Sequence, residues 1–499
     1  MFFSSQLWAS PNEDLLTASE VGNVDEVRRL LDQGLDLNHR DEHGDTPLHR
    51  ASRNGYSQVV DLLLERGAQV DERDAQGLTP LLIASYYGHL QVAQVLMDRG
   101  ANRNSCLSSG YTALDLAARN GNYDVVEFLL DEKFSMSVED QDRSHLLLWS
   151  AWKGDDQLVR ILLKNPQLQS NSICSVALQW ASKRGHISVV EAFFEEGCQD
   201  NPSDDFNSAL ISLAISYRQS KVVSLLLDRG IDVNGFNKDG DTPLILAGWN
   251  GYLELVTLLL ERGAQVDLPN SQGLTALIIS SKKGYKDVVD LLLERGAQVD
   301  LSDPYGFTAL LGAASSGHHE IVDGLLQKKA PVNQPDQDGF TPLMLAALGG
   351  HAQVLQLLLS SGAQLDCQNH AGDTALLLAV WSGKTEAVNI LLNHGASVEE
   401  SYKNGNTTLM LASGKGHIET VRLLLENKAD INRGSRVGDT ALMFASNRGH
   451  FEVVRLLVEN GAALNQVNKK GTTAVLAAVR RGNTRVVQFL LGKGARLSR

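Results

Sequence analysis

The chain has 499 residues, of which 43% are hydrophobic and 21% are charged, a composition typical of a folded protein and not of a disordered tether. Its 45 Lys and Arg against 59 Asp and Glu give a net charge of −14, which opposes nonspecific attraction to nucleic acid or to anionic membranes. No apolar run approaches the ~18 residues of a membrane helix, and residues 1–10 lack the pattern of a secretion signal. We therefore expect no membrane insertion and a cytoplasmic protein, with the nucleus as the alternative compartment.

The four cysteines, Cys106, Cys174, Cys198 and Cys367, lie far apart in the sequence and form no C-x-x-C pair. This spacing predicts neither a disulfide framework nor a zinc ribbon, and it favours reduced, intracellular thiols.

The chain repeats a unit of 33 residues. A glycine opens a Gly-x-Thr-(Pro/Ala)-Leu segment from Gly44 to Gly110 and again from Gly240 to Gly471. A second glycine follows eleven residues later in each unit, and only Arg218 interrupts that second column. A fixed period of this length indicates a repeat architecture.

Fifteen units tile residues 11–499, after an N-terminal extension at 1–10. We predict repeats with a polar N-terminal cap over 11–142, irregular repeats over 143–206, and regular repeats over 207–499. In the irregular block, His145-Leu146-Leu147 replaces Thr-Pro-Leu, so we predict a helical joint that divides the array. The last unit stops at Arg499, a repeat boundary, which indicates either a terminal cap or a missing effector region.

One unit can be interpreted from its residues. Pro47 suits the first turn of a helix, which we expect to end at Gly55 in a left-handed conformation. A second helix follows around Val59 and ends at Gly67, before a projecting turn. Small alanines such as Ala51 let neighbouring first helices approach closely. A single unit cannot bury its apolar face alone, so the units must stack.

The segment Thr46-Pro47-Leu48-His49-Arg50-Ala51 resembles the ankyrin repeat pattern, and partial copies recur along nearly the whole chain. The resemblance implies a mainly α fold, an α-solenoid of stacked helix-turn-helix repeats with β-hairpin fingers.

No catalytic constellation stands out in the sequence. Six histidines share one column, where the family uses the ring to cap and pack between units: His89, His186, His318, His351, His417 and His450. Phosphate-binding loops, nucleophile elbows and zinc-ligand spacings are lacking in the sequence. We predict that the chain is not an enzyme and that it needs no cofactor and no metal.

The last two positions of each first helix, which face the concave side in the family, carry eleven basic residues and no acidic one in units two to fifteen. We predict partner binding at the basic and aromatic residues of these positions: Arg53, Tyr86, Tyr87, Arg119, Trp152, Lys153, Lys183, Arg184, Tyr217, Trp249, Lys282, Lys283, Trp381, Lys415, Arg448, Arg480 and Arg481. Exposed aromatics beside Arg and Lys are enriched at binding hot spots. The alternative is that basic residues are common in these family columns and that the tryptophans pack on neighbouring helices.

Acidic residues gather instead near the ends of the second helices, on the outward side: Asp32, Glu65, Asp98, Asp131, Glu195, Asp228, Glu261, Glu294, Glu426 and Glu459. The predicted function is a non-catalytic, monomeric scaffold or adaptor whose basic, aromatic groove binds acidic protein segments with apolar anchors. The alternative function is the recognition arm of a larger enzyme or receptor. Single-stranded nucleic acid would also suit basic and aromatic residues, but the net charge argues against it.

Asn234 and Asn432 follow Leu-rich helices and resemble the finger asparagines that intracellular hydroxylases modify in ankyrin repeats. They are candidate hydroxylation sites, and the alternative role is a hydrogen bond to the turn backbone.

Overall fold

The computed structural model describes residues 11–130, 140–165, 168, 172–198, 204–402 and 404–497. The extension at 1–10 and the acidic residue Asp131 lie outside these ranges. The chain divides into two compact units, residues 1–202 and residues 203–499, and each is described by itself.

Unit 1 contains six helix pairs among its described residues. Its first helices are α1 (Pro11–Glu20), α3 (Pro47–Asn54), α5 (Pro80–Tyr87), α7 (Ala113–Arg119), α9 (Asp140–Lys153) and α12 (Ser172–Arg184). Its second helices are α2 (Val24–Asp32), α4 (Ser57–Glu65), α6 (Leu90–Asp98), α8 (Tyr123–Leu130), α10 (Asp156–Leu163) and α13 (Ile187–Glu195).

Unit 2 contains nine helix pairs in the part that the structure describes. Its first helices are α14 (Asp204–Ser216), α16 (Pro243–Asn250), α18 (Ala276–Lys283), α20 (Ala309–Ser316), α22 (Pro342–Gly349), α24 (Ala375–Ser382), α26 (Thr408–Lys415), α28 (Ala441–Arg448) and α30 (Ala474–Arg481). Its second helices are α15 (Ser220–Asp228), α17 (Leu253–Glu261), α19 (Lys286–Glu294), α21 (His319–Gln327), α23 (Ala352–Ser360), α25 (Thr385–Asn393), α27 (Ile418–Glu426), α29 (Phe451–Glu459) and α31 (Thr484–Gly492).

The regular first helices begin and end at positions set by the repeat. Thr46 is the N-cap of α3, its hydroxyl accepts from the backbone N–H of His49, and Pro47 occupies the first turn. Gly55 ends the helix with φ +82°, a left-handed conformation that costs glycine little. The predicted start and end of the first helix of a repeat are confirmed.

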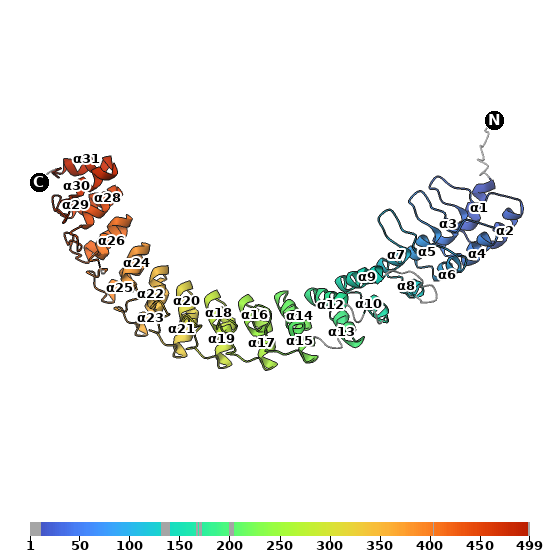
Figure 1. Ribbon diagram of the computed structural model, residues 1–499, viewed down its shortest axis with the longest axis horizontal. Coiled ribbons are helices and arrows are strands. Elements are labelled where there is room, and N and C mark those ends of the chain that lie inside the picture. The colour runs from blue at the N-terminus through green and yellow to red at the C-terminus, as the bar shows by residue number, and fades with distance from the viewer. Residues whose placement is uncertain are drawn as a thin grey trace, which may run out of the picture. The chain divides into compact units, whose positions relative to one another are not determined.

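In each unit the first helices pack beside one another in one row and the second helices in another (Figure 1). The alanine column lies between first helices and is buried, with Ala51, Ala181 and Ala247 fully inaccessible to solvent. The predicted α-solenoid of two-helix repeats is confirmed. Its fingers are mostly turns, and the β structure found in the described ranges consists of the isolated bridges Cys106–Thr112, Ser302–Thr308 and Ser401–Thr407.

The first helices α9, α12 and α14 are longer than the others, with 14, 13 and 13 residues against 8 in α3. His145, Val176 and Ala209 stand at the position that threonine occupies in the regular repeats. Without the hydroxyl that caps a helix there, helical hydrogen bonding extends further toward the N-terminus. The finger is correspondingly replaced by additional helix.

The prediction of four reduced thiols is wrong for two of them. Cys174 and Cys198 form a disulfide with their Cα atoms 6.3 Å apart, whereas Cys106 and Cys367 are free. Cys174 lies in the extra N-terminal turn of α12, and Cys198 lies in the turn that follows α13, three residues after its end. The antiparallel fold of this helix pair brings the start of one helix beside the end of the next, a pairing that spacing in the sequence does not reveal.

Candidate functional site

The ends of the first helices form the candidate interaction surface, here called the first-helix face. It consists of the seventeen predicted partner-binding residues, and all of them except Arg53 are exposed. The aromatic members Trp152, Trp249 and Trp381 keep 41%, 49% and 47% of their surface exposed. These rings therefore do not simply fill the space between helices.

Three tryptophans on this face each lie against a cation from the next repeat. The centroid of the Trp249 ring is 4.2 Å from Lys283 Nζ, and the Trp381 ring is 4.4 Å from Lys415 Nζ. In unit 1 the guanidinium carbon of Arg184 lies 4.4 Å from the Trp152 centroid. In each pair the tryptophan is the next-to-last residue of its first helix, and the cation is the last residue of the following one.

These pairs are cation–π contacts, in which the negative face of the indole attracts the positive charge. Arg184, Lys283 and Lys415 form no ion pair with a carboxylate among the described residues. Their charge is therefore held in place by an aromatic ring and is not neutralised. A partner carboxylate would meet a cation and an apolar ring edge at the same position.

The histidine column fixes the backbone of this surface. Each ring places Nε2 near the carbonyl oxygen of the next-to-last residue of the preceding first helix, for example His186 to Trp152 at 3.0 Å and His417 to Trp381 at 3.4 Å. The same bond is made by His89, His318, His351 and His450. The predicted structural role of this histidine column is confirmed, because each Nε2 atom lies within hydrogen-bond distance of a backbone carbonyl of the preceding repeat.

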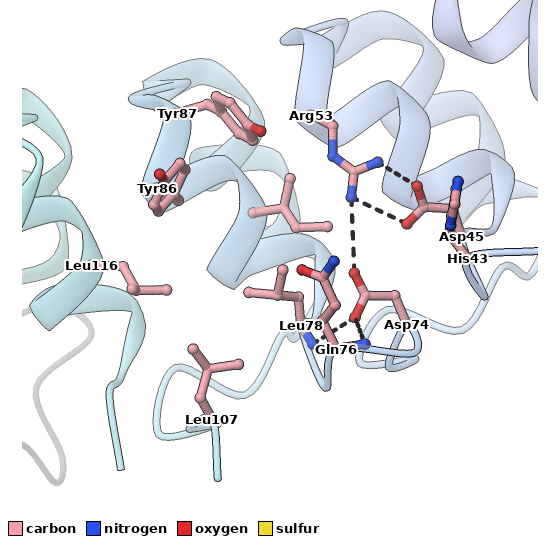
Figure 2. Close-up of a pocket in the computed structure, with 11 residues that line it drawn as sticks. His43, Asp45, Arg53, Asp74, Gln76, Leu78, Tyr86, Tyr87, Leu107 and Leu116 are labelled. Atoms are coloured by element: carbon pink, nitrogen blue, oxygen red, sulfur yellow. Dashed lines mark hydrogen bonds and ion pairs between the residues drawn. The ribbon is translucent and has the colours of Figure 1, made fainter. Parts of the chain in front are cut away.

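Arg53 differs from the other basic residues of the face. It is ion-paired with Asp45, and its Nη2 lies 3.8 Å from a carboxylate oxygen of Asp74. Both carboxylates come from fingers and are nearly inaccessible. Figure 2 shows Arg53 pointing toward these carboxylates, with Tyr86 and Tyr87 at the end of the next first helix. The cavity that these side chains line has a volume of about 550 Å³, and its arginine is already neutralised.

A second cavity of unit 1, about 570 Å³ in volume, lies between α9 and α12. Trp152, Lys183 and Arg184 were predicted for the surface, but Trp149 and Trp180, which also line this cavity, were missed. Helical spacing carries the signal that could have found them. Trp149 precedes Trp152 by three positions, and Trp180 precedes Lys183 and Arg184 by three and four, so each set shares one helix face.

On the second-helix side, acidic residues pair with arginines of the neighbouring repeat. Arg66 binds Asp32 and Arg262 binds Asp228, each at 2.8 Å. Arg160 binds Glu195 at 2.7 Å. These ion pairs are largely exposed, so each contributes ~0.2–1 kcal/mol to stability, and they reduce the negative charge of this side.

The two candidate hydroxylation sites make the same bond between repeats. The backbone N–H of Gln265 donates to Asn234 Oδ1 at 2.9 Å, and that of Ala463 donates to Asn432 Oδ1 at 2.7 Å. Each asparagine therefore links its own finger turn to the finger of the next repeat.

His49 is the one buried histidine ring of the described chain with both ring nitrogens engaged. Nδ1 lies 3.2 Å from the backbone nitrogen of Thr46 and accepts from it, and Nε2 lies 3.1 Å from the carbonyl oxygen of Glu72. Burial is the main cause that lowers the pKa of His49 below its ordinary value, although the Asp45 carboxylate opposes it. The site therefore stabilises the neutral form of the His49 ring.

Among the described residues, no group of three or more His, Cys, Asp or Glu side chains is placed to hold a metal ion. The same residues include no helix that is both long and apolar enough to span a membrane.

The chain is a helical repeat protein. Its two-helix repeats stack on one another, its first helices commonly end at a left-handed glycine, and a histidine often bridges two successive repeats. The family model described as "Ankyrin repeats (3 copies)" matches overlapping segments of the chain, which together cover residues 10–142 and 147–499. The chain belongs to the ankyrin repeat family. Ankyrin repeats are generally protein–protein interaction modules, and the fold is typically non-catalytic.

Similar proteins share parts of the chain. A putative palmitoyltransferase ZDHHC13 from Danio rerio is 31% identical over 117 residues, which are 23% of this chain and 18% of that protein. The ankyrin repeat-containing protein P1E11.10 from Schizosaccharomyces pombe is 33% identical over 67 residues, which are 13% of this chain and 32% of that protein. The chain therefore matches less than a third of the length of each of these relatives. The crystal structure of the human ASB11 ankyrin repeat domain aligns with 28% identity and a TM-score of 0.42, over 45% of this chain and 100% of that domain.

Proposed function

We propose that this chain is a non-catalytic scaffold or adaptor that binds acidic protein segments with apolar anchors on its first-helix face. The observation that carries the proposal is the recurrence of one tryptophan–cation arrangement at three places. Trp152 with Arg184, Trp249 with Lys283 and Trp381 with Lys415 occupy the same two positions of their repeats.

The physical basis is that each pair offers an apolar edge beside a fixed positive charge. A lysine lying over an indole has already lost part of its rotamer freedom, so binding a carboxylate costs less conformational entropy than binding to a mobile lysine. Tryptophan and arginine are also the residues most enriched at binding hot spots. Several such positions along one protein would add their affinities for a long or multivalent partner.

The alternative is that the chain serves as the recognition arm of a larger enzyme or receptor. The Danio rerio relative favours it, because a putative palmitoyltransferase carries a similar segment as 18% of its length. Both functions use the first-helix face in the same way and differ in what is attached to it. We also propose that the chain is monomeric and cytoplasmic or nuclear, which light scattering and imaging of the tagged chain would test.

The test is charge reversal with a matched control in unit 2. We expect Lys282→Glu with Lys283→Glu to weaken binding of a long peptide that repeats Glu, Asp and Phe to the first-helix face of unit 2 by at least about tenfold, because such a peptide uses several tryptophan–cation pairs at once. The control is Lys221→Glu with Lys328→Glu, which makes the same charge change at exposed lysines of the second-helix side. Equal losses in both variants would indicate long-range electrostatics alone, and no loss in either would refute the proposal.

A further inference from the structure

The cavity between α9 and α12 combines aromatic rings and cations of the first-helix face. Leu148, Trp149 and Trp152 line it from α9, and Trp180, Lys183 and Arg184 line it from α12. Its volume of about 570 Å³ lies within the range of pockets that enclose a ligand or several side chains.

The cavity lies between two first helices that lack the usual threonine cap. Both helices extend past the point where a regular first helix begins, and a helix face stands where a finger would otherwise project. Residues three and four positions apart share a face of a helix, so three indole rings and two cations are presented together. The disulfide between Cys174 and Cys198 ties α12 to the end of α13 and so restricts its position.

The charged side chains that the structure places against the Trp149 and Trp152 rings are cations. The guanidinium of Arg184 and the Lys153 amine lie 4.4 and 5.8 Å from the Trp152 centroid, and the Arg119 guanidinium lies 5.5 Å from that of Trp149. No carboxylate is among the described residues that line the cavity. The cavity lined by Arg53 is different, because two carboxylates already neutralise its cation.

We propose that this cavity is the principal anchor site for the acidic partner segment, and that it receives one bulky apolar side chain flanked by carboxylates. This inference rests on the proposed function and adds where the anchor binds and what its chemistry is. The side chain would lie among Trp149, Trp152 and Trp180, while the flanking carboxylates would reach Lys183 and Arg184. Aromatic anchors that fill such pockets dominate the affinity of many interfaces.

The test uses the full chain and a fluorescein-labelled peptide, Glu-Asp-Glu-Phe-Glu-Asp-Glu, with binding followed by fluorescence anisotropy. We expect Trp180→Ala to weaken binding by about thirtyfold, the usual range for a hot-spot residue. The peptide with Phe replaced by Ala, and the peptide with its acids replaced by Gln and Asn, should each bind at least about tenfold more weakly than the parent. Because Trp180 is 42% exposed, circular dichroism should show the variant to be folded. Arg184→Gln is a second variant, which keeps all three indole rings and should also weaken binding of the acidic peptide.

Tyr86→Ala is the comparison variant within the first-helix face, since it removes an exposed ring from a different cavity of the same unit. If Tyr86→Ala weakens binding and Trp180→Ala does not, the anchor site is wrong while the proposed function stands. The same conclusion follows if only the reversal of Lys282 and Lys283 weakens binding. If the chain binds none of the peptides, both proposals fail. Binding of 3-phenylpropionate as tight as that of the peptide would overturn the inference in favour of a small organic anion.

Discussion

The disulfide between Cys174 and Cys198 should determine the stability of the repeat that contains the anchor cavity. The two cysteines are separated by 24 residues. Closing a loop of that length removes chain entropy from the unfolded state worth about 3.5 kcal/mol at 25 °C. Because each repeat contacts only its neighbours, the loss on reduction should be confined to α12, α13 and the helices packed against them.

Two measurements test this expectation. A chain purified without reductant and then denatured should expose two titratable thiols, those of Cys106 and Cys367, and four after reduction. Hydrogen exchange in α12 and α13 should accelerate on reduction by up to about 300-fold, the equivalent of the loop-closure free energy. The double variant Cys106→Ser with Cys367→Ser should show the same acceleration. Four thiols before reduction, or unchanged exchange after it, would refute the reasoning.

Three further predictions concern single positions. The pKa of His49 is lowered in the folded chain, so the unfolded chain binds more protons just below pH 6.5. The stability of its repeat, measured by hydrogen exchange, should therefore fall as the pH drops through 6.5. The variant His49→Gln should lose this pH dependence. Asn432→Ala should destabilise its finger by about 0.5–1.5 kcal/mol, whereas Asn432→Asp keeps the acceptor oxygen and should cost less in the same measurement. Lys428 adopts the left-handed φ of +67° at a position where most repeats have glycine, and this conformation is strained for a residue with a side chain. Lys428→Gly should therefore slow local hydrogen exchange by the equivalent of about 1 kcal/mol. Faster exchange in the variant would contradict that account.

The repeating part of the structure could be predicted from the sequence because each element is specified locally. The hydroxyl of Thr46, the ring of Pro47 and the free φ of Gly55 act on neighbouring residues, so their column alone indicates where a helix begins and ends. The packing of Ala51 and the bridging role of His186 follow from the same register.

The features that the sequence did not predict depend on distances between repeats. Arg53 meets Asp45 and Asp74 only because two successive fingers fold over the end of its helix. Cys174 meets Cys198 only because α12 begins earlier than the repeat period implies. Trp149 and Trp180 could have been predicted as surface residues, because each shares a helix face with predicted partner-binding residues, but helical spacing does not reveal that a cavity lies between their two helices.

Site-specific photo-cross-linking tests the central claim most directly, that the first-helix face is the recognition surface. The acidic peptide carries benzophenylalanine in place of its Phe, and the cross-linked residues of the full chain are identified by mass spectrometry. We expect cross-links at the ends of first helices, most of all in α9 and α12, and their loss when unlabelled peptide competes. Competed cross-links that fall mainly on second helices would contradict the account.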